Sequence, residues 1–249
     1  MDTFFILPEF DFAFWASALI IIIAGMVRGF SGFGSALIMV PSLALFYSPI
    51  TAVICVIIID GLGSLQMIPF AMRHSDKKTV IPLAIAALIG IPLGATLLLS
   101  IDASLIKKVM AVFVLLFVIL IYKGWQLKGN KTFGTKMIAG FISGLCSGSI
   151  GMAGPPVILY LMSSGSNPQS LRASITLYFV FTTIIAMTTF ISAGVFEWSY
   201  LTISIFFIPF FVFGVILGGK LFHLATPKIF KNITLILLSV VGISTLIGS

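Results

Sequence analysis

Apolar stretches long enough to cross a lipid bilayer follow one another from Phe12 almost to the end of the chain. A spanning helix needs about 20 such residues. Only 8% of this chain is charged, against roughly 25% in a soluble domain. A soluble fold could not bury so much apolar surface, so the sequence predicts an all-α polytopic membrane protein. The stretches fall at residues 12–47, 52–72, 79–100, 104–123, 137–164, 172–192, 200–220 and 230–248.

Two of these segments, 12–47 and 137–164, are interrupted near their middle by glycines. The first has 36 residues, which as one helix would measure about 54 Å across a hydrocarbon core of about 30 Å. We therefore predict that each folds back as a broken-helix hairpin whose two ends lie on one face of the membrane. This topology places the acidic N-terminus outside and the basic stretches 73–78 and 124–136 in the cytoplasm, in line with the positive-inside rule. It leaves open whether the hairpins cross the whole bilayer.

The second half of the chain repeats features of the first at offsets of 119 and then 124 residues. The aligned pairs are Gly25 and Gly144, Gly32 and Gly151, Ser48-Pro49 and Asn167-Pro168, Gly90 and Gly214, and Gly94 and Gly218. Each half is then one hairpin plus three transmembrane helices, and three crossings invert the second half relative to the first. The sequence thus predicts two inverted-topology repeats, an architecture found in many secondary transporters. The first repeat is 1–123 (hairpin 12–47, helices 52–72, 79–100 and 104–123), the linker is 124–136, and the second repeat is 137–249 (hairpin 137–164, helices 172–192, 200–220 and 230–248).

The two glycine-rich breaks read RGFSGFGS from Arg28 and CSGSIGMAGPP from Cys146. Glycine lets the backbone approach a ligand closely, and each break precedes a new helix whose N–H groups and positive dipole end would face into the break. We therefore predict a shared site for a small oxyanion; simple turns at the hairpin tips are the alternative. The predicted substrate-binding residues are Arg28, Gly29, Ser31, Gly32, Phe33, Gly34, Ser35, Ser147, Ser149, Gly151, Met152, Ala153, Gly154 and Pro155.

Charged side chains inside the predicted spans are few, and an ionised group in a membrane is costly and usually functional. Arg28 is expected to bind the anion, to snorkel to a membrane face or to pair with an acid, and Asp60 either to carry a coupling proton or to pair with Arg28. Arg172 lies at a helix start, where it could anchor the membrane edge. The candidates for coupling or for lining a path are Asp60, Gln66, Arg172, Thr176 and Tyr178.

No motif in the sequence indicates an enzyme. His74 and His223 lie in loops without carboxylates at catalytic spacing, and GLGSLQ lacks the ending of a Walker loop. Cys55 and Cys146 lie singly in apolar runs, which predicts ordinary embedded residues and no metal site. The net charge of +7 fits the basic loops of a membrane protein better than nucleic-acid binding. We expect no cofactor; the expected partners are lipid, a small anion and, where Asp60 couples transport, protons, with an oligomer left open.

The stretch RGFSGFGSALIMVPSLALF followed by SP, with its counterpart GSIGMAGPPVILYLMSSG followed by NP, resembles the TauE/SafE sulfite exporter family, also called the 4-toluenesulfonate uptake permease family. The resemblance covers essentially the whole chain, including the lysine-bearing linker. Ala153 stands where many members have a glycine. The resemblance implies a secondary carrier of the bacterial inner membrane for sulfur-containing anions such as sulfite or sulfoacetate.

The residues and the resemblance together predict a secondary transporter that exports a small sulfur-containing anion, bound between the two breaks near the bilayer midplane. A negative cell interior favours the exit of an anion by about 2.3 kcal/mol per charge per 100 mV. An anion channel, or a permease for the uptake of another small organic anion, is the alternative.

Overall fold

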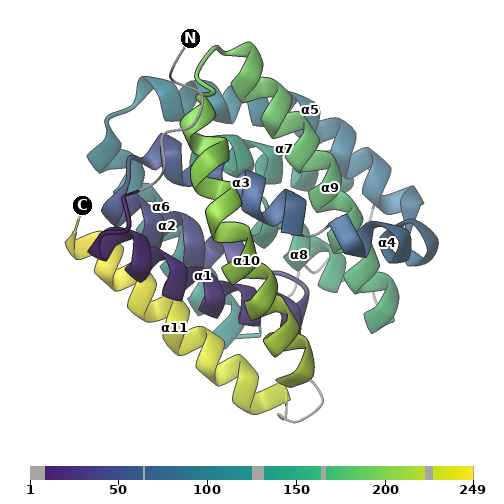
Figure 1. Ribbon diagram of the computed structural model, residues 1–249. Helices are drawn as coiled ribbons and strands as arrows, with labels where there is room; N and C mark the ends of the chain where they lie inside the picture. The colour runs from purple at the N-terminus through teal and green to yellow at the C-terminus, as the bar shows by residue number, and fades with distance from the viewer. Residues whose placement is uncertain (1–8, 64, 125–131, 164–166, 222–226, 249) are drawn as a thin grey trace.

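A computed structural model of the chain is helical throughout its regular elements and describes residues 9–63, 65–124, 132–163, 167–221 and 227–248 (Figure 1). The side chains of Gln66 and of residues 227–231 lie outside the described part, as does most of the expected linker, so the role suggested for Gln66 stays a prediction. The helices are α1 (Phe12–Ser31), α2 (Ser35–Phe46), α3 (Pro49–Gly63), the 3-10 turn η1 (Leu65–Met67), α4 (Ile68–His74), α5 (Lys77–Ser100), α6 (Ala103–Tyr122), α7 (Phe133–Ile150), α8 (Gly154–Met162), α9 (Pro168–Ser192), α10 (Trp198–Leu221) and α11 (Pro227–Ile247).

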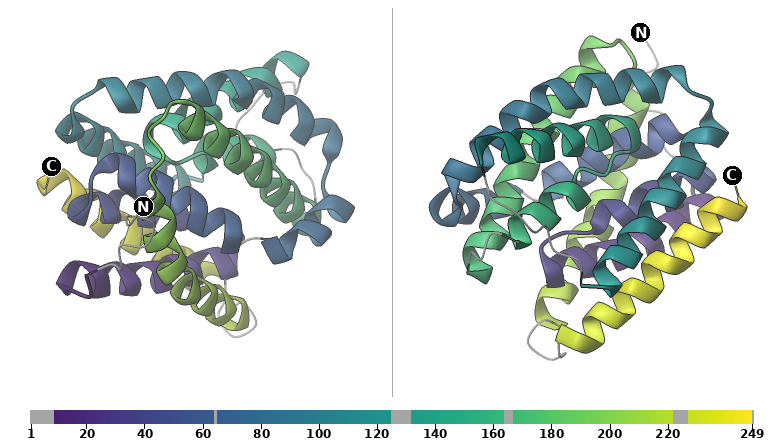
Figure 2. Two further views of the ribbon diagram at one scale, coloured as in Figure 1. Left: turned by 45° about the horizontal axis from the view of Figure 1, so that its top comes forward. Right: turned by 180° about the vertical axis from the view of Figure 1, so that it is seen from behind.

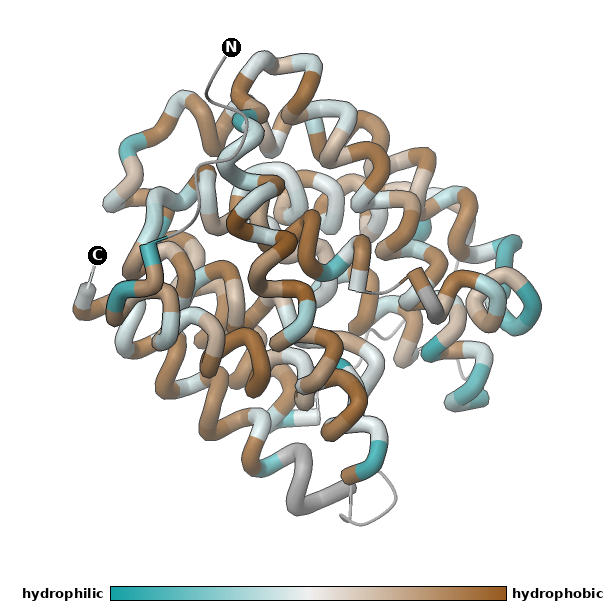
Figure 3. Tube along the Cα trace, viewed as in Figure 1, coloured by the Kyte–Doolittle hydropathy of each residue, from teal (hydrophilic) through white to brown (hydrophobic). Residues whose placement is uncertain are grey.

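Five of the described helices are long and apolar enough to cross a bilayer: α1, α5, α6, α9 and α10; α3 and α4 together would make a sixth. Their outer faces are apolar as well, since Val109, Val112 and Leu116 of α6 are exposed. Hydrophobic residues run along the helices, while hydrophilic ones gather at places such as the turn between α4 and α5 (Figure 3). These observations confirm the expected all-helical, multi-pass membrane architecture for the described residues.

The first hairpin consists of α1 and α2, separated by residues 32–34. The rings of Phe12, at the start of α1, and Phe46, at the end of α2, have centroids 6.4 Å apart, so the two ends of the hairpin lie side by side. The return arm α2 has 12 residues, which correspond to about 18 Å of helix. This arm is too short for a core of about 30 Å.

The segment expected as one helix at 52–72 is instead broken. α3 ends at Gly63, and α4 begins at Ile68 with its axis bent by 76° from that of α3. Gly61 and Gly63 weaken the end of α3, because glycine is a poor helix former. Pro69 lies in the first turn of α4, where the missing N–H removes no helical hydrogen bond. A third break therefore occurs in a segment whose length suggested a single span.

Helices α1 and α10 pack closely through glycines of both helices. A methyl group at Gly218 would collide with the carbonyl oxygen of Met26, and one at Gly214 would collide with that of Ile22. Because the obstacles are backbone atoms, a side chain at either position would force the helices apart.

Helices α5 and α7 pack in the same manner, and they lie side by side in both views of Figure 2. A methyl group at Gly94 would collide with the carbonyl oxygen of Leu145, and one at Gly148 would collide with that of Ile91. On another side of the molecule, α6 lies along α11 (Figure 2). The closest helix pairs thus each join a helix from the first half of the chain to one from the second.

Gly218→Ala should lower the free energy of unfolding by about 1–3 kcal/mol, the usual range for overpacking, because its methyl group meets the backbone of α1. The neighbouring Gly219 has open space within 4 Å of an added Cβ. Gly219→Ala should therefore leave stability unchanged or raise it by up to about 1 kcal/mol through better helix propensity. Thermal unfolding of the purified protein in detergent measures both. Equal midpoints for Gly218→Ala and the wild type would contradict this close packing.

Candidate functional site

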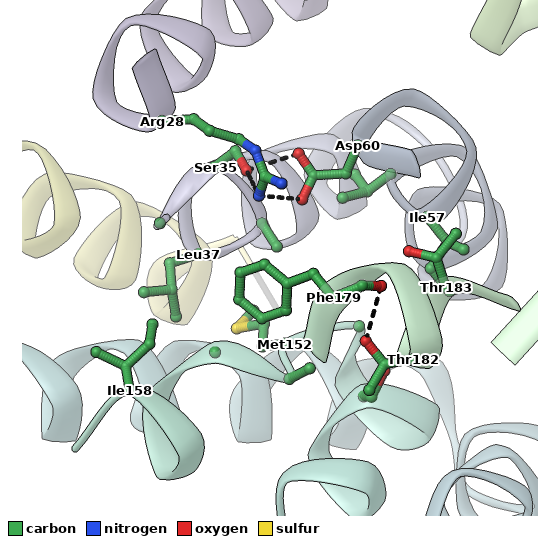
Figure 4. Close-up of a pocket in the computed structure, with 17 residues that line it drawn as sticks. Arg28, Ser35, Leu37, Ile57, Asp60, Met152, Ile158, Phe179, Thr182 and Thr183 are labelled. Atoms are coloured by element: carbon green, nitrogen blue, oxygen red, sulfur yellow. Dashed lines mark hydrogen bonds and ion pairs between the residues drawn. The ribbon is translucent and has the colours of Figure 1, made fainter. Parts of the chain in front are cut away.

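The two glycine-rich breaks line a common cavity of about 50 Å³, which we call the break cavity. It is large enough to hold water or a small polar ligand, since a single water needs roughly 10–15 Å³ on this scale. Its lining residues come from α1, α2, α3, α7, α8 and α9 (Figure 4). They are Arg28, Gly34, Ser35, Ala36, Leu37, Val56, Ile57, Asp60, Ser147, Gly151, Met152, Ala153, Gly154, Ile158, Phe179, Thr182 and Thr183.

Both breaks begin with the same kind of helix ending. Gly32 has φ 83° and its N–H donates to the carbonyl of Arg28 at 2.7 Å; Gly151 has φ 68° and its N–H lies 3.0 Å from the carbonyl of Ser147. The left-handed conformation favours glycine and closes the last turn of the helix. Each preceding helix, α1 or α7, is therefore sealed at its end before the chain turns into the next helix.

The helices that follow the breaks are open at their N-terminal ends. No side chain accepts a capping hydrogen bond at the start of α2 or α8, whereas Asp11, Thr132 and Asn167 cap α1, α7 and α9. The first turns of α2 and α8 line the break cavity through Ser35 and Gly154. Helix N-termini carry unsatisfied N–H groups and a partial positive charge. The cavity thus receives two such ends, a combination suited to an anion.

An ion pair lies in the wall of the cavity. Arg28 is 2% exposed, and its Nη1 lies 3.0 Å from Oδ2 of Asp60. The hydroxyl of Ser35 donates to the other carboxylate oxygen, Oδ1, at 2.7 Å. Figure 4 shows these three residues clustered above the ring of Phe179, whose centroid is 5.4 Å from the guanidinium carbon. Of the three roles weighed for Arg28, pairing with an acid is the one that this conformation adopts.

The second break is held in place by a buried chain of hydrogen bonds. Tyr178 on α9 donates to the hydroxyl of Ser143 on α7 at 2.8 Å, and Ser143 donates to the carbonyl of Ala153 just before α8. All three residues are buried. Tyr178, suggested by the sequence as a path-lining residue, is here placed as a support for the break.

The structure brings part of the predicted set together at the cavity. The predicted residues that line it are Arg28, Gly34, Ser35, Ser147, Gly151, Met152, Ala153 and Gly154, with Asp60. The predicted residues outside its lining are Gly29, Ser31, Gly32, Phe33, Ser149 and Pro155. The hydroxyl of Ser149 donates to the Leu145 carbonyl at 2.7 Å, and that of Ser31 lies 2.7 Å from the Val27 carbonyl, so both bond to their own helix.

Two further candidates lie close to the first break. Arg172 Nη2 donates to the carbonyl of Gly29 at 3.3 Å, so the side chain lies against the end of α1. Thr176 bonds to the Arg172 carbonyl at 2.9 Å and lines a second cavity. This outer cavity measures about 300 Å³ and shares Arg28, Ile57, Asp60, Phe179 and Thr183 with the break cavity. Its other lining residues are mostly apolar; two of them, Leu65 and Ile184, are exposed, so the cavity reaches the surface.

Sequence reasoning missed the contribution of the middle of α9. Phe179, Thr182 and Thr183 line the break cavity, and they stand three, six and seven residues after Thr176. These spacings place all four on one helical face. The signal that could have found them is therefore this periodicity.

The comparison with protein families decides the class of the chain. The family model described as Sulfite exporter TauE/SafE matches residues 17–245. The chain belongs to the TauE/SafE family. Its members are transporters, which confirms the expectation of a membrane transporter and not an enzyme. A search of curated proteins and a search of solved structures found no match. The family match of this TauE/SafE chain extends over both breaks.

Ser143→Ala should destabilise the protein more than Tyr178→Phe. Tyr178→Phe removes one hydrogen bond but leaves Ser143 on the Ala153 carbonyl, so we expect a loss of about 1 kcal/mol. Ser143→Ala strands a buried phenol and a buried carbonyl, so we expect about 2–3 kcal/mol. The double substitution should cost less than Ser143→Ala alone, because it removes the phenol hydroxyl that Ser143→Ala leaves unpaired. Equilibrium unfolding measures the three values; the reverse order would refute the hydrogen-bond chain.

Proposed function

We propose that this TauE/SafE transporter exports a small sulfur-containing anion, sulfite or an organosulfonate such as sulfoacetate, and binds it in the break cavity. The observation that carries the proposal is the meeting of two uncapped helix N-termini, those of α2 and α8, in one cavity with Arg28. The first turn of α2 presents the N–H groups of Ser35, Ala36 and Leu37, while α8 presents that of Gly154, because Pro155 and Pro156 have no N–H. Together with the two dipole ends, these donors can hold one ligand without bringing a full compensating charge. A tetrahedral or pyramidal oxyanion offers the matching acceptors.

The charges around the cavity favour an anion over a cation. Arg28 and Asp60 neutralise each other, while Arg172 lies against the first break and close enough to Arg28 for their charges to interact. Two arginines against one aspartate leave the site with a net positive charge. Among the described residues no group of three or more His, Cys, Asp or Glu side chains could hold a metal ion.

The substrate contacts proposed from the sequence can now be divided by position. Those at the cavity wall are Arg28, Gly34, Ser35, Ser147, Gly151, Met152, Ala153 and Gly154. The other predicted residues give the breaks their shape: Gly32 closes α1, Pro155 starts α8, and Gly29 packs against the backbone of α10. We propose the first group as substrate ligands and the second as their scaffold.

The architecture that we propose is a pair of inverted repeats, residues 1–123 and 137–249, in a bacterial inner membrane with the N-terminus outside. Under this scheme α1 corresponds to α7 and α10 to α5. The glycine-mediated pair α1–α10 then corresponds to the glycine-mediated pair α7–α5. A two-fold relation between the halves requires this correspondence. Hairpins that enter from opposite faces would bring the two breaks together at one cavity.

Substrate binding should stabilise the purified protein. We expect at least one of sulfite, thiosulfate, sulfoacetate, taurine and sulfate to raise the unfolding temperature, with about 2.7 kcal/mol of stabilisation at a concentration 100 times the Kd. Chloride at equal ionic strength serves as the salt control. Stabilisation by none of the five would count against a sulfur-containing anion.

Two serines on one turn of α7 give a matched test of the site. Ser147 lines the break cavity, whereas Ser149 bonds to its own helix and lies outside the lining. Ser147→Val should narrow the cavity and weaken ligand-induced stabilisation at least tenfold in Kd, while Ser149→Val should retain it. If Ser147→Val and Ser149→Val changed the Kd equally, the break cavity would not be the binding site.

Counterflow in liposomes should distinguish a carrier from a channel. A carrier that reorients around one site returns faster when it is loaded, so vesicles preloaded with unlabelled anion should take up labelled anion above its equilibrium level. An open pore has no such coupling between the two directions. Saturable flux with counterflow supports the proposal, and its absence from vesicles that conduct the anion would favour a channel.

A further inference from the structure

The carboxylate of Asp60 occupies groups that the proposed function assigns to the substrate. Its Oδ2 lies 3.0 Å from Nη1 of Arg28, and its Oδ1 accepts a hydrogen bond from Ser35 in the first turn of α2. A substrate oxyanion in the break cavity would seek the same two donors. We infer that Asp60 is an internal competitor for the substrate anion, and that it releases Arg28 by taking up a proton. This inference rests on the proposed role of the break cavity in binding an anion.

It is energetically unfavourable for the Asp60 carboxylate and a substrate anion to share the donors of Arg28 and Ser35. An anion bound to Arg28 would leave a carboxylate that is only 17% exposed beside a second negative charge. Both the lost partner and the new like charge favour the neutral acid form of Asp60. Once protonated, the carboxyl group becomes a hydrogen-bond donor and no longer competes for the guanidinium. Anion binding and proton uptake are therefore linked.

The surroundings leave Asp60 as the group that takes the proton. Of the residues lining either described cavity, Arg28 is the other ionisable one; α2, α8 and α9 contribute serine, threonine, glycine and apolar side chains. Arg172 of α9 lies beyond Arg28, against the Gly29 carbonyl, and remains a cation. The lysines of α5, α6 and α10 (Lys77, Lys78, Lys107, Lys108 and Lys220) line neither cavity. Asp60 also lines the outer cavity.

The link between anion binding and proton uptake determines the net charge that is transported with the substrate. In the empty cavity the Arg28 cation faces the Asp60 anion; in the loaded cavity it faces the substrate anion, and Asp60 carries a proton taken from solvent. The net charge is the same in both states for a singly charged substrate. When the anion leaves, Asp60 gives its proton to the same side and re-forms its pair with Arg28. One proton thus accompanies each anion. For a singly charged substrate the gradients of anion and pH, not the membrane potential, set the direction of transport; a doubly charged substrate still moves one net charge.

The pH dependence of binding tests this inference. Thiosulfate, sulfoacetate and sulfate serve as probes, because strong-acid groups and ordinary carboxylates keep constant charge between about pH 6 and 9. Wild-type affinity should fall as pH rises, by up to tenfold per pH unit, because a deprotonated Asp60 must gain a proton before the anion binds. Asp60→Asn should bind at all these pH values with the affinity that the wild type reaches at low pH. Asp102→Asn, an exposed aspartate outside both cavities, should match the wild type.

Calorimetry in buffers of different ionisation enthalpy gives a readout that needs no variant. The wild type should take up close to one proton per anion at high pH, and Asp60→Asn none. Anion binding by the wild type without proton uptake, or unchanged pH dependence in Asp60→Asn, would overturn the inference while leaving the site intact. If neither the wild type nor either variant bound any of the three probe anions, the proposed function would be refuted instead.

Flux measurements extend the same test to transport. When sulfoacetate is added outside wild-type vesicles in a single concentration step, its uptake should carry protons inward, which is measured as a fall of the internal pH. Sulfoacetate carries two negative charges, so with one proton it moves one net charge through the wild type. In Asp60→Asn no proton accompanies it and two charges move, so net flux should become more sensitive to a clamped potential. If Asp60→Asn moved as many protons per anion as the wild type, Asp60 would not be the group that takes up the proton.

Discussion

A helix that ends inside a membrane exposes backbone groups that lipid cannot satisfy, and both breaks are built around this constraint. At the C-terminal ends of α1 and α7 the constraint is met locally, because Gly32 and Gly151 turn the chain back so that their N–H groups bond to the preceding turn. At the N-terminal ends of α2 and α8 no side chain supplies a cap. The same constraint thus closes one side of each break and leaves the other side to the cavity between them.

Arg28 joins the geometry of the first break to its charge. Its carbonyl accepts the hydrogen bond that closes α1, and its guanidinium pairs with Asp60 on α3. A buried ion pair contributes little to stability by itself, because desolvation offsets much of the attraction. We propose that its position at the wall of both cavities serves ligand exchange. Any rearrangement of the pair would also reach the end of α1 through the same residue.

Sequence reasoning located the features that conflict with a simple span and missed those that do not. Segment 12–47 is too long for one crossing, so its break was predictable; the bend after Gly63 lies in a segment of ordinary length. Phe179 was missed because an aromatic side chain in a membrane helix carries no polar signal, and its contact depends on the rotation of α9. Ser149 is the opposite case: its hydroxyl looks available in the sequence but bonds to its own helix and lies outside the lining of the break cavity.

The glycine contacts between α1 and α10 and between α5 and α7 place a limit on genetic repair. At Gly94, Gly148 and Gly218 the nearest atom to an added side chain is a backbone carbonyl oxygen of the partner helix. Every amino acid carries that oxygen, so no substitution on the facing helix can make room. Second-site suppressors of a bulky change should therefore lie elsewhere, at positions that let two helices separate along their whole length. Such suppressors would map where the helices are free to move apart, far from the damage that they relieve.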